Sequence, residues 1–339
     1  MSTPPATVPK KSGEDTALDV ALRPQQWDEF IGQERVKKNL RILIDAARQR
    51  SEPMEHVLLA GPAGLGKTSM AHLMAREMQC SIRITSGPAI ERVGDLASLL
   101  TNLLPGDILF IDEVHRLNKL IEEVLYPAME SRTLDIIIGK GPSARTIQLE
   151  LPPFTLIAAT TRPGLLSSPL RSRFGSSFRL EFYSPEELAR ILNRSSRVLG
   201  VALDSAAGAL LAASSRQTPR VANRLLKRCR DYAQVHAQGA IAHDVVKKAL
   251  GLMEIDELGL EPMDRTLMRV IIEKFNGGPV GLQSLAAAAS EEEDAITEIY
   301  EPYLMQLGFI ERTPRGRMVT ERAYQHLGIA SRKQPSLLG

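Results

Sequence analysis

The sequence predicts an α/β protein with a parallel sheet, followed by a small helical unit and a C-terminal winged helix. Short apolar runs alternate with segments of helical period over the first half of the chain. Such alternation is typical of a parallel sheet covered by helices. After Ser184 only amphipathic helical segments follow, until two short β-type runs near the C-terminus flank a turn.

Composition restricts the class of protein. The 339 residues, 43% of them hydrophobic, suffice for two or three domains with cores of their own. A formal net charge of +2 does not indicate a nucleic-acid partner, so any DNA-binding surface must be a local patch. Cys80 and Cys229 lie in helix-like segments without metal-ligand spacing, which favours reduced core residues of a cytoplasmic protein. No run is apolar enough for a signal sequence or a membrane span, and no membrane partner is expected.

The expected elements divide the chain into four parts. The strands of the sheet are "HVLLA", "SIRIT", "DILFID", "FTLIAATT" and "FRLEF", and the later helical segments carry Ser, Asp or Thr at their N-caps. "FIERT" and "RMVT", joined by a turn with Pro314 and Gly316, follow a helix pair as the wing of a winged helix. We expect a polar flexible tail over residues 1–20 and domains over residues 21–183, 184–256 and 257–332.

"GPAGLGKT" indicates a phosphate-binding loop. Gly61, Gly66, Lys67 and Thr68 fit the pattern G-x-x-x-x-G-K-[ST] between an apolar strand and a helical segment. Glycines let backbone N–H groups face the phosphates, the lysine reaches the β and γ oxygens, and the hydroxyl ligates Mg²⁺. The alternative is a chance glycine-rich turn, which the strand and helix context disfavours.

Two further strands end in groups suited to hydrolysis. In "ILFIDEVHRL", Asp112 can hold Mg²⁺ and Glu113 can polarise the attacking water, although such a carboxylate pair alone is more often a helix N-cap. "FTLIAATTRPG" ends in Thr160 and Thr161, either of which could position the water or simply satisfy local backbone groups. We favour Thr161, but the sequence does not decide between them.

Together these motifs resemble an AAA+ ATPase, and more specifically the bacterial RuvB family of Holliday junction branch-migration motors. The resemblance runs from about Leu22 to about Gly328 and rests on long strings such as "LRPQQWDEFIGQE", "LYPAME", "SPLRSRFG", "TPRVANRLLKR" and "RTPRGRM". Ala63 and Ser69 vary the phosphate loop, and the tail carries no motif.

The resemblance implies a homohexameric ring with ATP bound between subunits. Arg173 of "PLRSRFG" falls on the arginine finger that completes the neighbour's site, and Arg220 falls on the lid sensor. Arg171 would be an interface or structural residue. The alternative is that both arginines of "PLRSRFG" are simply solvent-exposed residues of a surface helix. The implied catalytic residues are Glu113, Arg173, Thr161 and Lys67, and the implied metal ligands are Thr68 and Asp112. The implied nucleotide contacts are Leu22, Arg23, Ile31, Gly61, Gly64, Gly66, Lys67, Thr68, Ser69, Asp112, Tyr183 and Arg220, with Glu130, Ser131, Arg132 and Arg173 facing the adjoining subunit's nucleotide.

Two partner surfaces follow from the resemblance. The insertion over residues 133–152 has two β-type runs around a glycine-rich turn, and it would engage a RuvA-like junction-binding protein through Ile136 and Ile138. These isoleucines could equally stabilise the hairpin itself. The wing would contact duplex DNA at the junction through Arg312, Arg315 and Arg317, which have no nearby acid in the sequence except Glu311. A basic wing can also be a solvated turn, and a RuvC-like resolvase is a further implied partner.

The resulting hypothesis is an ATP- and Mg²⁺-dependent DNA translocase that drives branch migration in recombination and repair. The main alternative is an AAA+ loader or nucleotide-switched regulator acting on DNA, which would normally lack both the hairpin and the basic wing. A non-enzymatic DNA-binding adaptor is weaker, since it would have no use for Glu113 or Arg173.

Overall fold

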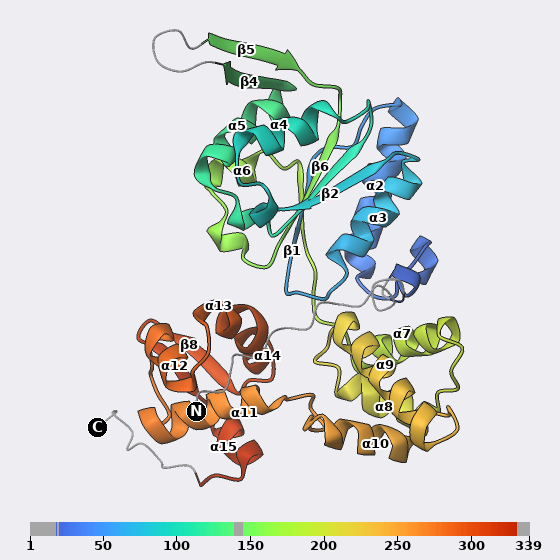
Figure 1. The fold of residues 1–339 in the computed structure, drawn as a ribbon, viewed down its shortest axis with the longest axis vertical. Coiled ribbons are helices and arrows are strands. Elements are labelled where there is room, and N and C mark those ends of the chain that lie inside the picture. The colour runs from blue at the N-terminus through green and yellow to red at the C-terminus, as the bar shows by residue number, and fades with distance from the viewer. Residues whose placement is uncertain (1–17, 19, 139–144, 331–339) are drawn as a thin grey trace.

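The computed structural model describes residue 18, residues 20–138 and residues 145–330. Most of the predicted N-terminal tail and the turn of the predicted hairpin therefore lie outside the described residues. Figure 1 shows three bodies, an α/β body with a projecting hairpin and, at the opposite end, two mainly helical bodies side by side. We call them the P-loop body, the lid and the head. None of the helices in the described ranges is long and apolar enough to cross a membrane.

The P-loop body holds a parallel sheet with strand order β2-β3-β6-β1-β7. Its strands are β1 (Val57–Ala60), β2 (Ile82–Ser86), β3 (Ile108–Asp112), β6 (Thr155–Thr160) and β7 (Ser176–Arg179). Its helices are α2 (Glu34–Arg50), α3 (Lys67–Glu77), α4 (Val93–Thr101), α5 (Lys119–Glu130) and α6 (Ser168–Ser172), with short 3-10 turns η1 (Trp27–Glu29), η2 (Gly87–Ala89), η3 (Val114–Arg116) and η5 (Pro163–Leu165). Because β6 lies between β1 and β3, the carboxyl ends of these three strands meet at one edge of the sheet.

Both faces of the sheet are buried. Val57 and Leu59 of β1 join the core that contains α2 and α3, whereas Leu58 joins the core beneath α4 and α5. Alternate residues of a strand point to opposite faces, so a continuous apolar run is what a doubly covered strand requires. The first of these cores continues into the lid, where it includes Leu192 and Leu250.

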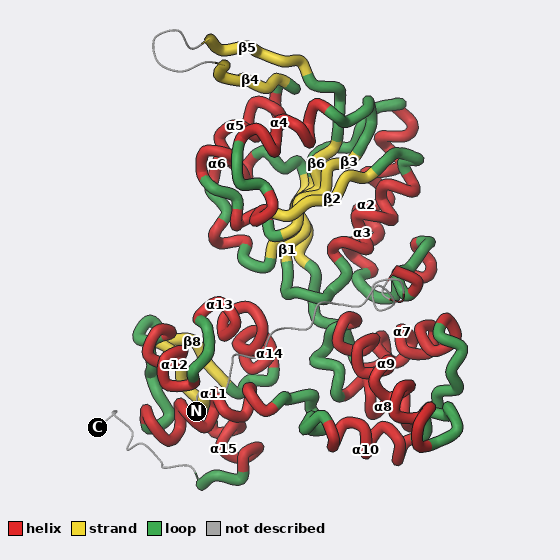
Figure 2. Tube along the Cα trace, in the orientation of Figure 1, coloured by secondary structure: helices red, strands yellow, loops and turns green. Residues whose placement is uncertain are grey.

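The predicted hairpin is present as a separate antiparallel pair, β4 (Thr133–Ile138) and β5 (Arg145–Glu150), in which Ile136 pairs with Ile147. Figure 2 shows these strands apart from the central sheet and projecting beyond α4 and α5. Ile136 is partly buried against the core under α5, which supports the stabilising alternative for this residue. The side chain of Ile138 lies outside the described residues.

The lid consists of α7 (Pro185–Val198), α8 (Ser205–Ala213), α9 (Pro219–His236) and α10 (His243–Leu252). Three predicted N-caps are confirmed, because the side chains of Ser184, Asp204 and Thr218 each accept a hydrogen bond from a backbone N–H of the first turn.

The head confirms the winged-helix prediction. It contains α11 (Pro262–Phe275), α12 (Leu282–Ala289), α13 (Glu293–Ala295), α14 (Glu301–Gln306), the wing strands β8 (Ile310–Thr313) and β9 (Gly316–Val319), and α15 (Glu321–Leu327). The segment "EEEDAITEIYEPYLMQLG", residues 291–308, has the helical period of a single helix, but a π-helical turn, η6 (Ile296–Tyr300), interrupts it. Pro302 explains the interruption, since it has no N–H to donate to the carbonyl of Glu298 and its ring crowds that carbonyl.

Two further expectations need correction. Strand β7 covers residues 176–179 rather than the expected "FRLEF", because the chain turns after Arg179 toward the lid. Cys80 lies in the turn after α3 rather than in a helix, while Cys229 is in α9 as expected. Both thiols are free, Cys229 is fully buried, and Cys80 is partly buried.

Candidate nucleotide-binding site

The phosphate loop joins β1 to α3 and requires its glycines. Gly61, Gly64 and Gly66 have φ values of +143°, +84° and +98°, which L-residues with a side chain rarely adopt. A Cβ on Gly61 would lie 2.8 Å from the carbonyl oxygen of Leu180, and one on Gly66 would lie 3.0 Å from the ring of Phe30. The loop therefore presents backbone at the N-terminus of α3, where N–H groups and the helix dipole favour an anion.

Lys67 is the buried cation of this loop. Lys67 is only 6% exposed. Its ammonium donates hydrogen bonds to the carbonyl of Gly61 at 2.6 Å and to that of Pro62 at 2.8 Å. Burial lowers the pKa of Lys67 to about 8, although the carboxylates of Asp112 and Glu113 oppose this shift. The ammonium and both carboxylates thus face the same site.

Glu113 is linked to the neighbouring strand. The hydroxyl of Thr161 donates to its carboxylate at 3.2 Å, and the backbone N–H of Glu113 donates to Asp112 at 3.0 Å. Burial, reinforced by the charge of Asp112, raises the pKa of Glu113. A desolvated carboxylate with a raised pKa is a better proton acceptor for water than an ordinary surface glutamate.

Thr160 has a different set of contacts. It is fully buried, its hydroxyl lies 2.9 Å from His115 Nδ1, and its oxygen accepts the backbone N–H of Arg162 at 3.0 Å. His115 Nε2 in turn lies 3.4 Å from the carboxylate of Glu113. Thr160 therefore holds the local backbone and the histidine, whereas Thr161 faces Glu113. The sequence reasoning missed His115, whose only signal was its place two residues after the glutamate in "DEVHRL".

A pocket of about 300 Å³ joins these groups to the lid. The predicted residues that line it are Leu22, Arg23, Ile31, Gly64, Gly66, Lys67, Thr68, Ser69, Asp112, Glu113, Tyr183 and Arg220. Lining residues that the sequence reasoning missed are Pro24, Glu29, Phe30, Ala63, Ile191, Arg194, Pro219 and Asn223. Gly61 shapes the loop from behind without lining the pocket.

The lid closes one side of the pocket through direct contacts. The hydroxyl of the buried Tyr183 donates to the carbonyl of Leu65 at 3.1 Å, and the backbone N–H of Arg220 donates to that of Gly64 at 3.3 Å. A Cβ on Gly64 would lie 2.9 Å from the Cβ of Arg220. The side chain of Arg220 therefore begins next to the phosphate loop.

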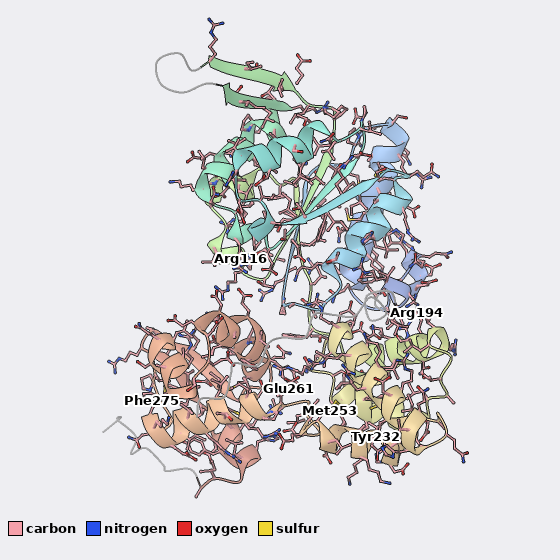
Figure 3. All side chains as sticks on the ribbon, viewed as in Figure 1. Arg116, Arg194, Tyr232, Met253, Glu261 and Phe275 are labelled. Atoms are coloured by element: carbon pink, nitrogen blue, oxygen red, sulfur yellow. The ribbon has the colours of Figure 1, made fainter. Side chains whose placement is uncertain are left out.

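Arg194 of α7 fixes the other side of the pocket. It donates to the carbonyls of Leu22 at 2.9 Å and Arg23 at 3.3 Å, and it pairs with Glu29 at 2.6 Å. Figure 3 labels Arg194 at the top of the lid, where α7 meets the N-terminal segment. The sequence offered no signal for this role beyond a charge on an amphipathic helix.

The arginines of "PLRSRFG" lie outside this pocket. Arg173 follows α6, pairs with Glu130 at 3.0 Å, donates to the carbonyl of Pro169 at 2.7 Å, and lies 4.3 Å above the ring of Tyr126. Besides Gly61, the other predicted residues that line no part of the pocket are Glu130, Ser131, Arg132 and Thr161. Arg173 and residues 130–132 thus form a second group at the ends of α5 and α6.

Comparison with known families covers all three bodies. Models of the Holliday junction DNA helicase RuvB P-loop domain, the RuvB AAA lid domain and the RuvB C-terminal winged-helix domain match residues 22–180, 183–256 and 257–328. The chain belongs to the RuvB family. The resemblance stated from the sequence is confirmed, and the chain is a P-loop ATPase and a Holliday junction branch-migration motor.

RuvB relatives match along nearly the whole chain. The Holliday junction branch migration complex subunit RuvB of Dehalococcoides mccartyi is 59% identical over 316 residues, which are 93% of this chain and 90% of that protein. The Thermotoga maritima RuvB Holliday junction branch migration motor has a TM-score of 0.85 at 50% identity, over 91% of this chain and 99% of that one. A single-substitution variant of the same protein has a TM-score of 0.86 at 50% identity, with the same coverage.

The wing differs from one expectation, because its arginines have a nearby acid other than Glu311. Arg312 makes two hydrogen bonds to the carboxylate of Glu301, at 3.0 and 2.8 Å, and Arg317 pairs with it at 3.1 Å. Glu301 is 2% exposed, so Glu311 is not the only acid near the wing. Glu301 lies 11 residues before Arg312 and reaches the arginines because α14 packs on β8. Arg315 is exposed, and its side chain makes no hydrogen bond or ion pair with any residue that the structure describes.

Proposed function

We propose that this chain hydrolyses ATP with Mg²⁺ in a hexameric ring around duplex DNA and uses the energy to move Holliday junctions. The observation that carries the proposal is the convergence of Lys67, Asp112 and Glu113 on one pocket that the lid closes through Arg220. A nucleotide bound there contacts the P-loop body and the lid together, so hydrolysis can change the angle between them.

The residues of the pocket have different roles in nucleotide binding and hydrolysis. Lys67 and the N–H groups of the loop bind the phosphates, and Arg220 adds a cation from the lid. Glu113 accepts a proton from the attacking water, and Thr161 orients Glu113 through the hydrogen bond described above. Tyr183 and Leu22, both buried at the base of the lid, enclose the adenine side.

The donor set of the pocket fits Mg²⁺. Thr68 and Asp112 both line the pocket and supply oxygen ligands, which this cation prefers. No cluster of three or more His, Cys, Asp or Glu side chains that could hold a metal occurs in the described ranges. Mg²⁺ at such sites takes one or two protein ligands and completes its shell with phosphates and water. When bound, it neutralises charge on the β- and γ-phosphates.

Arg173 and residues 130–132 would serve the adjoining subunit. They lie together at the ends of α5 and α6 and line no part of the pocket of their own chain. A planar guanidinium on this surface can reach a γ-phosphate only across a subunit boundary. This arrangement makes each site complete only in a ring.

Two surfaces suit the macromolecular partners. The projecting β4–β5 hairpin would dock a RuvA-like junction-binding protein, with Ile136, Ile138 and the 45% exposed Ile147 as apolar contacts. The wing would contact phosphates of the duplex through Arg315 and the half-exposed Arg312, while Arg317 is 12% exposed and holds the wing through Glu301. A RuvC-like resolvase would act on the same junction.

The test is ATP-driven movement of a synthetic four-way junction, measured with and without a RuvA-like partner. We expect movement with wild type. Lys67→Ala should lose nucleotide binding, whereas Glu113→Gln should bind ATP without turning it over. ATP-dependent capture of DNA without junction movement would indicate a loader instead.

A further inference from the structure

The head contacts the P-loop body through Arg162, the residue directly after Thr160 and Thr161. Its guanidinium pairs with Asp294 at 3.2 Å and Glu298 at 3.1 Å and also donates to the hydroxyl of Thr297. These three partners belong to α13 and η6 of the head. In Figure 3 the labelled Arg116, on η3 after His115, marks the side of the P-loop body that faces the head.

The lid contacts the same part of the head through Arg216, four residues before Arg220. Arg216 pairs with Asp264 at 2.7 Å, and the two side chains are 8% and 0% exposed. It also donates to the carbonyl of Ile299 in η6 at 3.0 Å and stacks on the ring of Tyr303 at 4.9 Å. Arg216 has a φ of +50°, a left-handed conformation that needs tertiary contacts to hold it.

Both arginines therefore end on η6, and each lies next to a different nucleotide-facing motif. Arg162 directly follows Thr161, whose hydroxyl donates a hydrogen bond to Glu113. Arg216 lies four residues before Arg220, the lid arginine that contacts the phosphate loop. The helix continues from η6 directly into α14, whose first residue is the Glu301 that holds Arg312 and Arg317 of the wing.

A π-helical turn suits a moving joint. Its i→i+5 hydrogen bonds are rarer and less regular than those of an α-helix, and such turns are frequent at functional sites. A shift of η6 by a fraction of a turn would carry Glu301 and the arginines that it holds. Glu301 and the wing are directly connected, because α14 packs on β8.

We propose that Arg162 is a positioning residue that transmits the nucleotide state of Thr161 to the wing through η6, with Arg216 as the second input from the lid. This inference rests on the proposed function, since it assumes that ATP and DNA bind where described above. Arg162 touches neither ligand. It biases the position of an element on which both sites depend, which is the requirement for coupling between sites.

A purely adhesive role for Arg162 makes a different prediction. If Arg162 only fastened the head to the P-loop body, its loss would change thermal stability or DNA affinity equally in every nucleotide state. A coupling role instead requires that the ratio of DNA affinities in two nucleotide states should change. The ratio is therefore the quantity to measure.

The experiment uses the full-length chain and a duplex of fixed length at fixed salt. Wild type, Arg162→Gln, Glu298→Gln and the double variant are compared, with Arg41→Gln as the matched control, because Arg41 forms an ion pair with Asp28 on the exposed surface. DNA dissociation constants are measured with a non-hydrolysable ATP analogue and with ADP. For wild type we expect them to differ by about fivefold or more, within the usual range of allosteric coupling.

In Arg162→Gln and in Glu298→Gln the ratio should fall toward one, and the double variant should lose no more than either single variant. ATP affinity and ATPase activity without DNA should stay within about twofold of wild type, while stimulation by DNA is lost. Arg41→Gln should keep the wild-type ratio.

An Arg162→Gln ratio equal to that of wild type overturns the inference, and so do additive losses in the double variant. A wild-type chain that moves junctions but binds DNA equally in both nucleotide states also overturns it, while the proposed function stands. A wild-type chain that neither hydrolyses ATP nor moves junctions overturns both.

Discussion

Replacing Arg173 by alanine separates a structural role from a role in the neighbour's site. The ion pair with Glu130 is partly exposed, 20% for Arg173 and 58% for its partner, and such pairs contribute about 0–1 kcal/mol. Stacking on Tyr126 adds about 0.5–1 kcal/mol. The variant should therefore lose about 0.5–2 kcal/mol of stability and remain folded at room temperature.

The expected kinetic effect is much larger. An arginine finger contributes about 10³-fold or more to the rate of hydrolysis, which corresponds to about 4 kcal/mol of transition-state stabilisation. Because Arg173 lines no part of its own pocket, ATP binding to Arg173→Ala should equal that of wild type. A thousandfold loss of ATPase activity with intact binding and assembly cannot follow from a loss of at most about 2 kcal/mol of folding stability, because about 90% or more of the molecules stay folded.

Mixing with Lys67→Ala subunits decides whether the arginine acts in the neighbouring site. Each variant alone is nearly inactive, but in a mixed ring some interfaces pair an intact phosphate loop from one parent with an intact finger from the other. At equal amounts and random assembly, about a quarter of the interfaces are complete, so about a quarter of the wild-type ATPase activity should return. Size-exclusion chromatography with light scattering checks that mixed rings form. If they form and no activity returns at any ratio, the trans assignment is refuted.

Three other predictions can be checked on single variants. Arg315→Ala should weaken duplex binding for all sequences alike and reduce the slope of log affinity against log salt by about one, because it would contact a phosphate; loss confined to one sequence would contradict this. Gly64→Ala should raise the dissociation constant of ATP about tenfold, because a left-handed residue with a Cβ costs about 1–2 kcal/mol and this Cβ would press on Arg220. An unchanged ATP titration would refute the closed lid geometry. Burial raises the pKa of the Cys229 thiol to about 12, so Ellman's reagent at neutral pH should modify this residue only after unfolding, as peptide mapping of the labelled chain can show.

Periodic and local features of the fold were predictable from the sequence. The sheet strands are continuous apolar runs because both faces are buried, and the N-caps of α7, α8 and α9 are the residues that the local pattern indicates. The π-helical turn was not predicted, because the helical period persists through residues 291–308 and only the position of Pro302 breaks the hydrogen-bond ladder.

Candidate site residues were predictable where they sit in a short motif. Lys67, Asp112 and Arg220 come from three separate segments that the parallel topology and the lid bring to one pocket. Long-range polar contacts left no local signal. Arg194 lies 172 residues after Leu22 in the sequence, and Glu301 approaches the wing through the packing of α14 on β8. No sequence motif connects either pair.

The core shared by the P-loop body and the lid has a consequence for how the chain matures. Apolar residues on the α2 and α3 side of the sheet belong to one cluster with lid residues as far along the chain as Leu250. During synthesis that side of the sheet lacks its last partners until α10 has left the ribosome, so the nucleotide pocket can be completed only after the lid exists. The head has a separate cluster that begins at Leu260. The head can therefore fold after the P-loop body and the lid are complete. A chain that stalls between the two stages would have the nucleotide pocket but would lack the wing that we propose binds DNA.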